Sequence, residues 1–141
     1  MGHGRFAVTG GEDVSGTVSD LPRVVRRTGA WQAASKVVYS TTLAAVSTAG
    51  TRLERRFDPA AVRELKAAAS SDLTIGGADL AGRAFRAGLV DECRLVVLPV
   101  LLGGGKPGLP TGVRAELQLL DERRFENGVV HLHYRVPGSD R

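Results

Sequence analysis

The chain has 141 residues, of which 43% are hydrophobic and 24% are charged, with a formal net charge of +4 and a pI near 9.8. This length suits one domain with a single core, and no apolar run is long enough to span a membrane. The basic balance would suit an anionic ligand, but aromatic residues make up only 5% of the chain, which argues against nucleic-acid binding.

Residues 1–30 show no sustained helix or strand period, so we expect a poorly defined N-terminal segment with a short strand around Val24 as its one candidate element. Three basic residues there, Arg23, Arg26 and Arg27, leave a charge-based nucleic-acid hypothesis open. The first residues also lack the apolar segment of a secretory signal, so a cytoplasmic location is expected. Residues 31–141 are predicted to form the domain.

Two short strands are expected after Trp31. The run Lys36–Ser40 favours a strand that ends in hydroxyl residues, and Thr51–Leu53 favours a second one. The charged residues 54–56 that follow fit a solvated edge. Ser40 and Thr41 either close the first strand or contact a ligand, and the residues alone leave both interpretations open.

The clearest helix begins at Asp58-Pro59, because an Asp at the N-cap and a Pro at the first helical position are both typical of helix starts. Its 3.6-residue period predicts an inward apolar stripe and an outward charged face. The stripe consists of Ala61, Val62, Leu65, Ala68 and Ala69, and the outward face of Arg63, Glu64 and Lys66.

A strand, a glycine turn, a helix and a second strand follow in order, which is typical of a β-α-β unit. The predicted pieces are Leu73–Ile75, Gly76-Gly77, Ala78–Ala87 and Cys93–Leu101. A helix start after two residues without Cβ presents free N–H groups at a positive dipole end, and such a place suits a phosphate. The last strand is nearly all aliphatic and is expected to be covered on both faces, with Cys93 as a small core residue.

The C-terminal part favours two strands, Ala115–Asp121 and Val129–Val136, joined by the two-residue hairpin signal Asn127-Gly128. Alternation in the second strand predicts one buried face and one wet face. His131 and His133 share the wet face, but no third ligand and no orienting carboxylate is visible, so we expect an exposed pair and no metal.

Three runs in fixed order carry a specific resemblance: Ile-Gly-Gly-Ala-Asp-Leu, Ala-Gly-Leu-Val-Asp-Glu-Cys and Leu-Pro-Val-Leu-Leu-Gly-Gly-Gly-Lys-Pro, within residues 75–107. They resemble the C-terminal half of dihydrofolate reductase-like reductases, and in particular the reductase domain of the bifunctional riboflavin-biosynthesis deaminase/reductase. The resemblance implies an α/β fold with a mixed, mostly parallel sheet flanked by helices and a C-terminal antiparallel hairpin. It also implies a homodimer with a contact near that hairpin.

The resemblance further implies NADPH as cofactor. Its pyrophosphate would lie at the glycine bend, formed by Ile75, Gly76, Gly77, Ala78, Asp79 and Leu80. A Ser-Arg-Thr-like turn that approaches the 2′-phosphate in the family is matched by Ser40 and Thr41. Thr41 stands where an arginine is common in the family, which leaves the choice between NADPH and NADH open. Arg52 or Arg55 could replace the missing guanidinium.

The implied activity is hydride transfer from NADPH to a ribosylaminopyrimidine-like or other small molecule, similar to 5-amino-6-(5-phosphoribosylamino)uracil reductase. Two family motifs are absent: a first strand with a Ser-Leu-Asp-Gly-like sequence, and a Gly-Arg-x-Thr/Met-Tyr-Glu-like run. That strand would be central, so we expect an unpaired position in the sheet, and no catalytic residue is assigned. The alternative is a shortened, non-catalytic domain that binds a nucleotide or dimerises.

Overall fold

The computed structural model describes residues 6–10, 33–105 and 107–138, which belong to two units. The larger unit contains residues 6–10 and those from Asp58 onward, and the smaller unit contains residues 33–57. Each unit is described by itself. The short predicted strand around Val24, the three arginines at 23–27 and Lys106 lie outside the described residues.

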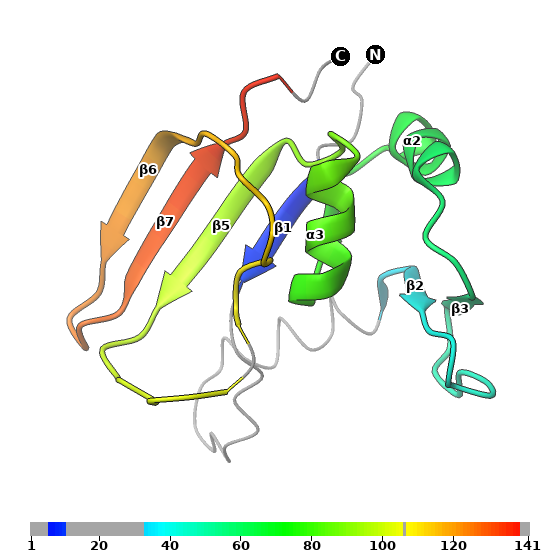
Figure 1. The fold of residues 1–141 in the computed structure, drawn as a ribbon, viewed down its shortest axis with the longest axis horizontal. Coiled ribbons are helices and arrows are strands. Elements are labelled where there is room, and N and C mark those ends of the chain that lie inside the picture. Colours follow the sequence, from blue (N-terminus) through cyan, green and yellow to red (C-terminus); the bar gives the residue numbers. More distant parts are fainter. Residues whose placement is uncertain (1–5, 11–32, 106, 139–141) are drawn as a thin grey trace. The chain divides into compact units, whose positions relative to one another are not determined.

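A five-stranded sheet in the order β4-β1-β5-β7-β6 forms the larger unit (Figure 1). The strands are β1 (Phe6–Gly10), β4 (Leu73–Ile75), β5 (Glu92–Val97), β6 (Gln118–Arg124) and β7 (Val130–Arg135). β1 runs parallel to both β4 and β5, whereas β7 runs antiparallel to β5 and β6. The predicted α/β fold with a mixed sheet and a C-terminal antiparallel hairpin is confirmed.

The centre of the sheet differs from the sequence-based expectation. We expected residues 1–30 to be largely irregular and a central strand to be missing, but β1 lies inside the sheet between β4 and β5. The register joins Val8 to Ile75 on one side and to Cys93 on the other. A five-residue strand without strong alternation gives little local signal, so only its pairing with two neighbours identifies it.

Two helices follow the predicted boundaries closely. In α2 (Pro59–Ala68), the Asp58 carboxylate accepts a hydrogen bond from Ala60 N at 2.9 Å, which confirms the predicted N-cap. Helix α3 (Ala78–Arg86) ends where Gly88 takes a φ of 65° and donates from its N–H to Phe85 O at 3.0 Å. This left-handed residue is the predicted stop signal.

The predicted buried stripe of α2 is mostly wrong. Only Val62 of that stripe is buried, and Leu65 is 37% exposed. Lys66, which we expected to face water, instead forms a partly buried ion pair with Asp91 at 2.6 Å, just before β5. The contact arises because the aliphatic stem of Lys66 lies along the packed surface while its ammonium reaches a carboxylate. Helix α2 is therefore held by the buried Val62, by the Lys66–Asp91 ion pair and by a hydrogen bond from Arg63 Nη2 to Ala87 O at 3.2 Å.

The core of the larger unit lies on one face of the sheet, which α3 covers (Figure 1). Ile75 and Cys93 point to this face, since both are paired with the same residue of β1. The buried apolar residues are Val62, Ile75, Ala81, Ala84, Leu89, Val90 and Cys93. Small alanines on α3 let the helix approach the strands closely.

The last apolar strand is shorter than predicted. β5 ends at Val97 instead of Leu101, and Val96, Val97 and Leu98 are 44%, 50% and 42% exposed. The expectation that this strand is covered on both faces is therefore wrong beyond Leu95. Pro99 cannot donate to a strand neighbour, and the helix that covers the sheet lies at β1 rather than over this end (Figure 1).

The C-terminal hairpin is confirmed, with a shifted first strand and a different turn. β6 runs from Gln118 to Arg124, and Gly128 N donates to Phe125 O at 3.0 Å to close the turn. Gly128 has a φ of 82° and follows the two central turn residues rather than being one of them. The predicted division of β7 into a buried and a wet face is wrong, because Val130–Tyr134 are all half-buried.

The smaller unit contains the two predicted short strands, β2 (Lys36–Tyr39) and β3 (Thr51–Glu54), paired in parallel. Tyr39 and Phe57 contact each other edge to face, with ring centroids 5.6 Å apart. Among the described residues of both units, no helix is long and apolar enough to cross a membrane.

We expect Val90→Ala to lower the free energy of unfolding by about 2 kcal/mol, because it removes two buried methyl groups and leaves a small cavity. Val90 is only 1% exposed. Val97→Ala, at a position that is 50% exposed, is the matched control and should change the stability little. Urea unfolding followed by circular dichroism measures both, and equal losses would contradict this description of the core.

Candidate functional site

The glycine bend lies between β4 and α3 and is open to solvent. Ile75 before it is buried, whereas Gly76 and Gly77 are both exposed. A Cβ placed on either glycine would meet no atom of residues 6–10, 33–105 or 107–138 within 4 Å. Gly77 is the N-cap of α3 with a φ of 89° and a ψ of 125°, a conformation that residues with a side chain rarely adopt. The predicted bend therefore exists, and no side chain in the part of the chain that the structure describes covers it.

The amides at the start of α3 have no side-chain cap among the described residues. No side chain of those residues hydrogen-bonds to the N-terminus of this helix, and its first internal bond runs from Ala81 N to Gly77 O at 2.9 Å. The N–H groups of Ala78, Asp79 and Leu80 precede that bond, so the helix itself offers them no acceptor. Together with the positive end of the helix dipole they can hold a phosphate, although the exposed Asp79 carboxylate in the same turn reduces the positive field.

The second predicted contact, the turn after β2, is held by its own hydrogen bonds. Ser40 Oγ accepts from Thr42 N at 3.3 Å and from Leu43 N at 3.1 Å. The Ser40 hydroxyl thus shapes the turn, as one of the two open interpretations proposed, while Thr41 is exposed. The Arg55 guanidinium donates to Ser40 O and Ala44 O, both at 3.2 Å, and also to Leu43 O.

The predicted site residues fall into both units. Residues 75–80 form one continuous bend in the larger unit, and Ser40 and Thr41 form one turn in the smaller unit. The joint contribution of these two places to a single cofactor stays a prediction.

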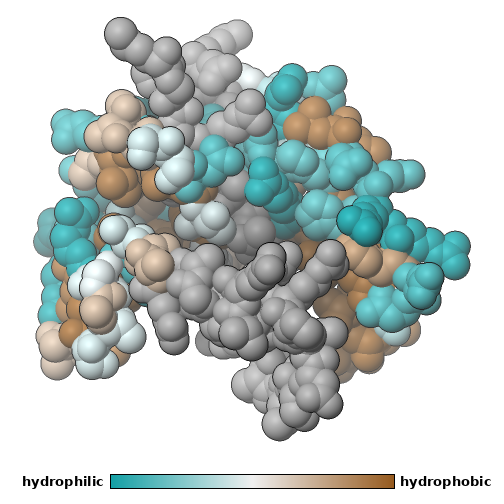
Figure 2. All heavy atoms as spheres, turned by 180° about the vertical axis from the view of Figure 1, so that it is seen from behind, coloured by the Kyte–Doolittle hydropathy of each residue, from teal (hydrophilic) through white to brown (hydrophobic). Residues whose placement is uncertain are grey.

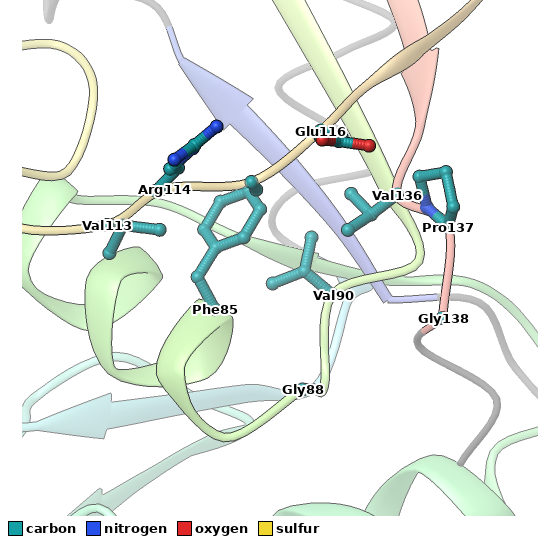
Figure 3. Close-up of a pocket in the computed structure, with 10 residues that line it drawn as sticks. Phe85, Gly88, Val90, Val113, Arg114, Glu116, Val136, Pro137 and Gly138 are labelled. Carbon is teal, nitrogen blue, oxygen red and sulfur yellow. The ribbon is translucent and has the colours of Figure 1, made fainter.

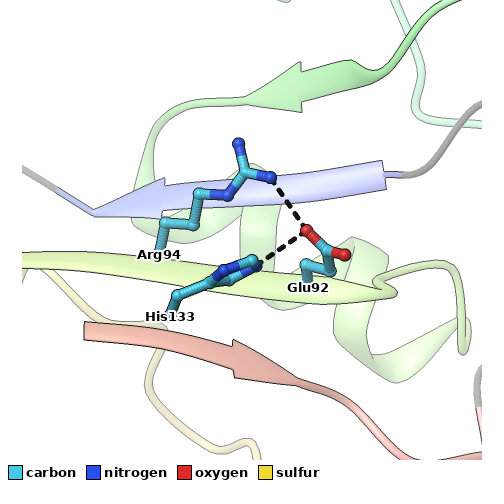
Figure 4. A network of polar contacts seen from close by, with 3 residues as sticks. All are labelled: Glu92, Arg94 and His133. Carbon is cyan, nitrogen blue, oxygen red and sulfur yellow. Dashed lines mark hydrogen bonds and ion pairs between the residues drawn. The ribbon is translucent and has the colours of Figure 1, made fainter. Parts of the chain in front are cut away.

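A buried carboxylate cluster on the sheet was missed by the sequence analysis. Glu92 is only 3% exposed, and its Oε2 lies 2.9 Å from Arg94 Nη2 and 2.8 Å from His133 Nε2 (Figure 4). The expectation that His133 is exposed and has no carboxylate partner is therefore wrong. The sequence did contain a signal for this cluster. Glu92 and Arg94 are two residues apart at the start of an apolar strand, so their side chains point to the same face and can pair.

The face that carries this cluster is mainly polar. The register places Arg135 opposite Glu92, and Arg94 and Asp121 on either side of His133. Figure 2, which views the molecule from behind, shows hydrophilic side chains gathered over the hairpin side of the sheet. Within the described ranges no group of three or more His, Cys, Asp or Glu side chains could hold a metal ion. The buried carboxylate thus pairs with the Arg94 guanidinium and lies within hydrogen-bond distance of the His133 imidazole.

Cys93 is 1% exposed, as expected for a core residue. Burial raises the pKa of its thiol, which keeps the thiol neutral at physiological pH. A neutral, buried thiol is a poor nucleophile, so the structure favours packing as the role of this residue.

A pocket of about 370 Å³ lies at the opposite end of α3 from the glycine bend (Figure 3). Phe85, Val90 and Val136 form its apolar wall, and the exposed Arg114 and Glu116 lie at its edge. Since α3 has nine residues, the pocket and the bend are separated by about 13 Å of helix. None of the predicted site residues lines this pocket.

Comparison with known proteins identifies the family. Residues 10–131 match the family model described as the RibD C-terminal domain. The chain belongs to this family. The predicted resemblance to dihydrofolate reductase-like riboflavin reductases is thereby confirmed.

A curated relative, an uncharacterized protein named YyaP from Bacillus subtilis (strain 168), is 39% identical to the chain over 79 residues. The match covers 55% of the chain and 42% of that relative, so the chain spans less than half of it.

Three solved structures share the fold at 12–16% identity. A putative riboflavin biosynthesis protein from Shewanella sp. PV-4 has a TM-score of 0.64 over 93% of the chain and 73% of its own length. A pyrimidine reductase-like protein from Corynebacterium diphtheriae reaches 0.52 over 94% and 75%. Acinetobacter baumannii RibD, in a crystal form called form 1, reaches 0.53 over 95% and 58%. At these identities the likeness concerns the fold alone.

The two glycines of the bend should respond differently to alanine. Gly77→Ala should lower the free energy of unfolding by about 1–3 kcal/mol, because its φ of 89° strains a residue with a Cβ. Gly76→Ala should change it by less than about 1 kcal/mol, because Gly76 has no positive φ and its Cβ would meet open space. Thermal and urea unfolding of both variants measure the difference, and a larger loss for Gly76→Ala would contradict the geometry of the bend.

Proposed function

We propose that the protein is an NADPH-dependent reductase of the riboflavin-biosynthesis type. The observation that carries the proposal is the open, uncapped bend at Gly76-Gly77, found in a chain that belongs to the RibD C-terminal domain family. Outward amides, a positive helix end and the absence of Cβ atoms together suit the pyrophosphate of a dinucleotide. The residues of the bend therefore fit this cofactor.

Each part of the chain would have a defined task. The amides of Ala78, Asp79 and Leu80 would bind the pyrophosphate, and the absence of a Cβ on Gly76 would let the phosphate approach the backbone. The Ser40–Thr41 turn would approach the adenosine 2′-phosphate. NADPH would supply the hydride when bound, and the protein would orient it and exclude water.

The substrate that we propose is a ribosylaminopyrimidine-like small molecule. Support comes from the family and from the fold shared with a protein described as pyrimidine reductase-like. No catalytic side chain is assigned, because hydride transfer requires positioning rather than a protein nucleophile.

A non-catalytic nucleotide-binding domain is the second candidate. The interior strand β1 has the sequence Phe-Ala-Val-Thr-Gly, which lacks the Ser-Leu-Asp-Gly-like motif that lines the substrate site in the family. This favours a chain that retains the sheet but not the complete cleft. Oxidation of NADPH in the presence of 5-amino-6-(5-phosphoribosylamino)uracil would reject this candidate, and nucleotide binding without turnover would support it.

We expect the purified protein to bind NADPH and Gly76→Val to weaken that binding at least about tenfold, or about 1.4 kcal/mol. The added side chain would occupy the space that the pyrophosphate requires, while the empty surroundings and the absence of a positive φ should preserve the fold. The change in NADPH fluorescence during titration measures the Kd.

Gly108→Val is the matched control, since Gly108 also has no positive φ and open space around it but lies in the loop after β5. Thermal unfolding of Gly76→Val must remain within a few degrees of the wild-type curve for the comparison to count. Equal NADPH affinity in the wild type and in folded Gly76→Val would reject the pyrophosphate assignment, and absent binding in the wild type would reject the proposed function.

A homodimer is also part of the proposal, together with the cytoplasmic location expected from the sequence. β6 lies at an edge of the sheet and is exposed along its length, and Leu117, Leu119 and Leu120 are 40%, 47% and 38% exposed. The exposed leucines at and just before the start of this edge strand offer a small apolar surface that a second copy of the chain could cover.

Sedimentation equilibrium should therefore give twice the 14.9 kDa chain mass, and Leu119→Asp should shift the protein toward monomers by placing a charge in the contact. Leu101→Asp is the control, because Leu101 is fully exposed and lies outside β6. A monomeric wild type at micromolar concentration, or equal effects of both variants, would reject this interface.

A further inference from the structure

The pocket at the C-terminal end of α3 is built by three separate segments of the larger unit. Phe85 and Val90 come from the end of the helix and the turn before β5, and Val136 follows β7. The irregular segment 113–116, which precedes β6, forms the remaining side. A volume of about 370 Å³ lies near the lower end of the range for small-molecule pockets, so it suits a small metabolite rather than a whole dinucleotide.

Contacts on two sides hold the walls of this pocket in place. A Cβ on the buried Gly82 would lie 3.1 Å from Pro110 Cβ, so the glycine lets the chain before β6 pack closely against α3. Phe85 lies one turn farther along the same face of the helix. On the opposite side, Val136 N donates to Asp91 O at 2.8 Å, which fixes the segment after β7 beside the start of β5. The pocket is therefore part of the packed unit.

The interior of the pocket is apolar. Phe85, Val90 and Val136 point into the same space (Figure 3). Val90 is 1% exposed, whereas Phe85 and Val136 are half-buried and keep part of their apolar surface in contact with water. An apolar group in this space would remove that surface from water, which favours binding.

Two opposite charges lie at the edge of the pocket without pairing. Arg114 and Glu116 are exposed, and neither has a hydrogen-bond or ion-pair partner within residues 6–10, 33–105 and 107–138. They do not pair with each other either, although only one residue separates them. Figure 3 shows both beside the apolar side chains. The edge thus offers a guanidinium and a carboxylate to one ligand.

The charges around the pocket disfavour a phosphate. The C-terminal end of α3 carries the negative end of the helix dipole, and Glu116 adds a second negative charge. The amides nearest this end are used within the helix, since Ala87 N and Gly88 N donate to Arg83 O and Phe85 O. A dianion would therefore meet one guanidinium and two negative groups, whereas an ammonium would be attracted by both of the latter.

We propose that this pocket binds a small zwitterion with an apolar side chain, namely a free α-amino acid such as leucine or phenylalanine. The carboxylate of the ligand would accept from Arg114, its ammonium would donate to Glu116, and its side chain would contact the apolar interior. The inference goes beyond the proposed function and does not depend on it, because the pocket shares no residue with the glycine bend.

Titration of the ¹⁵N-labelled 14.9 kDa chain with L-phenylalanine or L-leucine, followed by two-dimensional NMR, tests the site. We expect saturable shifts of the amides of Gly88, Val113 and Gly138, which line the pocket, and none at Gly76 and Gly77. Glycine, which lacks an apolar side chain, should cause no saturable shift. The absence of saturable shifts with either amino acid up to about 10 mM, or shifts confined to other parts of the chain, would overturn the inference.

Analogues with one charge test the zwitterion. 3-Phenylpropionate lacks the ammonium and phenethylamine lacks the carboxylate, so each should bind the wild type at least about threefold more weakly than L-phenylalanine. Equal affinity for the amino acid and for either analogue would reject the assignment of the two charges.

Two variants assign the charges to residues. Arg114→Gln should weaken L-phenylalanine at least about threefold and leave phenethylamine unchanged. Glu116→Gln should weaken L-phenylalanine by a similar factor and leave 3-phenylpropionate unchanged. Arg124→Gln and Glu122→Gln are the matched controls, because both residues are exposed on β6 and do not line the pocket. They should not change the Kd for L-phenylalanine.

The analogues also control for the fold, because a damaged pocket would weaken the amino acid and the analogue in parallel. Parallel weakening, or an unchanged Kd in Arg114→Gln, would contradict the proposed contacts. If neither variant folds, the analogue series on the wild type still decides. A wild type that binds L-phenylalanine but not NADPH would keep this site and lose the reductase proposal, and the reverse result would do the opposite.

Discussion

The backbone pairing of β1 is the constraint on which the larger unit depends. β4 and β5 belong to one β-α-β unit, yet they do not pair with each other, because β1 lies between them and hydrogen-bonds to both. β4 has only three residues and lies at the sheet edge, so β1 is its strand partner. Five residues near the N-terminus thus connect the glycine bend to the rest of the sheet.

This pairing also determines what each face of the sheet can do. With β4, β1 and β5 parallel, Ile75 and Cys93 point to the face that α3 covers, and Glu92 and Arg94 point to the other. The first face contains the apolar core, whereas the second contains a buried carboxylate in contact with Arg94 and His133. The bend follows the end of β4, where α3 must begin in order to return the chain to β5. Its exposure is a consequence of the crossover.

The two turns proposed to contact the cofactor present different backbone groups. At Gly76-Gly77 the backbone offers donors, since the first amides of α3 have neither a helical acceptor nor a side-chain cap. At Ser40–Ala44 the backbone offers carbonyl oxygens, and the Arg55 guanidinium donates to them.

The sequence alone determined the features that depend on neighbouring residues. Asp58-Pro59 began a helix and Gly88 ended one, the paired glycines formed an exposed bend, and Asn127-Gly128 marked the hairpin, because capping and positive φ are decided within a few residues. The tertiary structure decided the contacts between distant residues. These are the place of β1 between β4 and β5, the hydrogen bond between Glu92 and His133 across 41 positions, and the hydrogen bond from Arg55 to Ser40 O. Such contacts depend on which strands become neighbours, and strand order is set by the packing of the whole unit rather than by any local pattern.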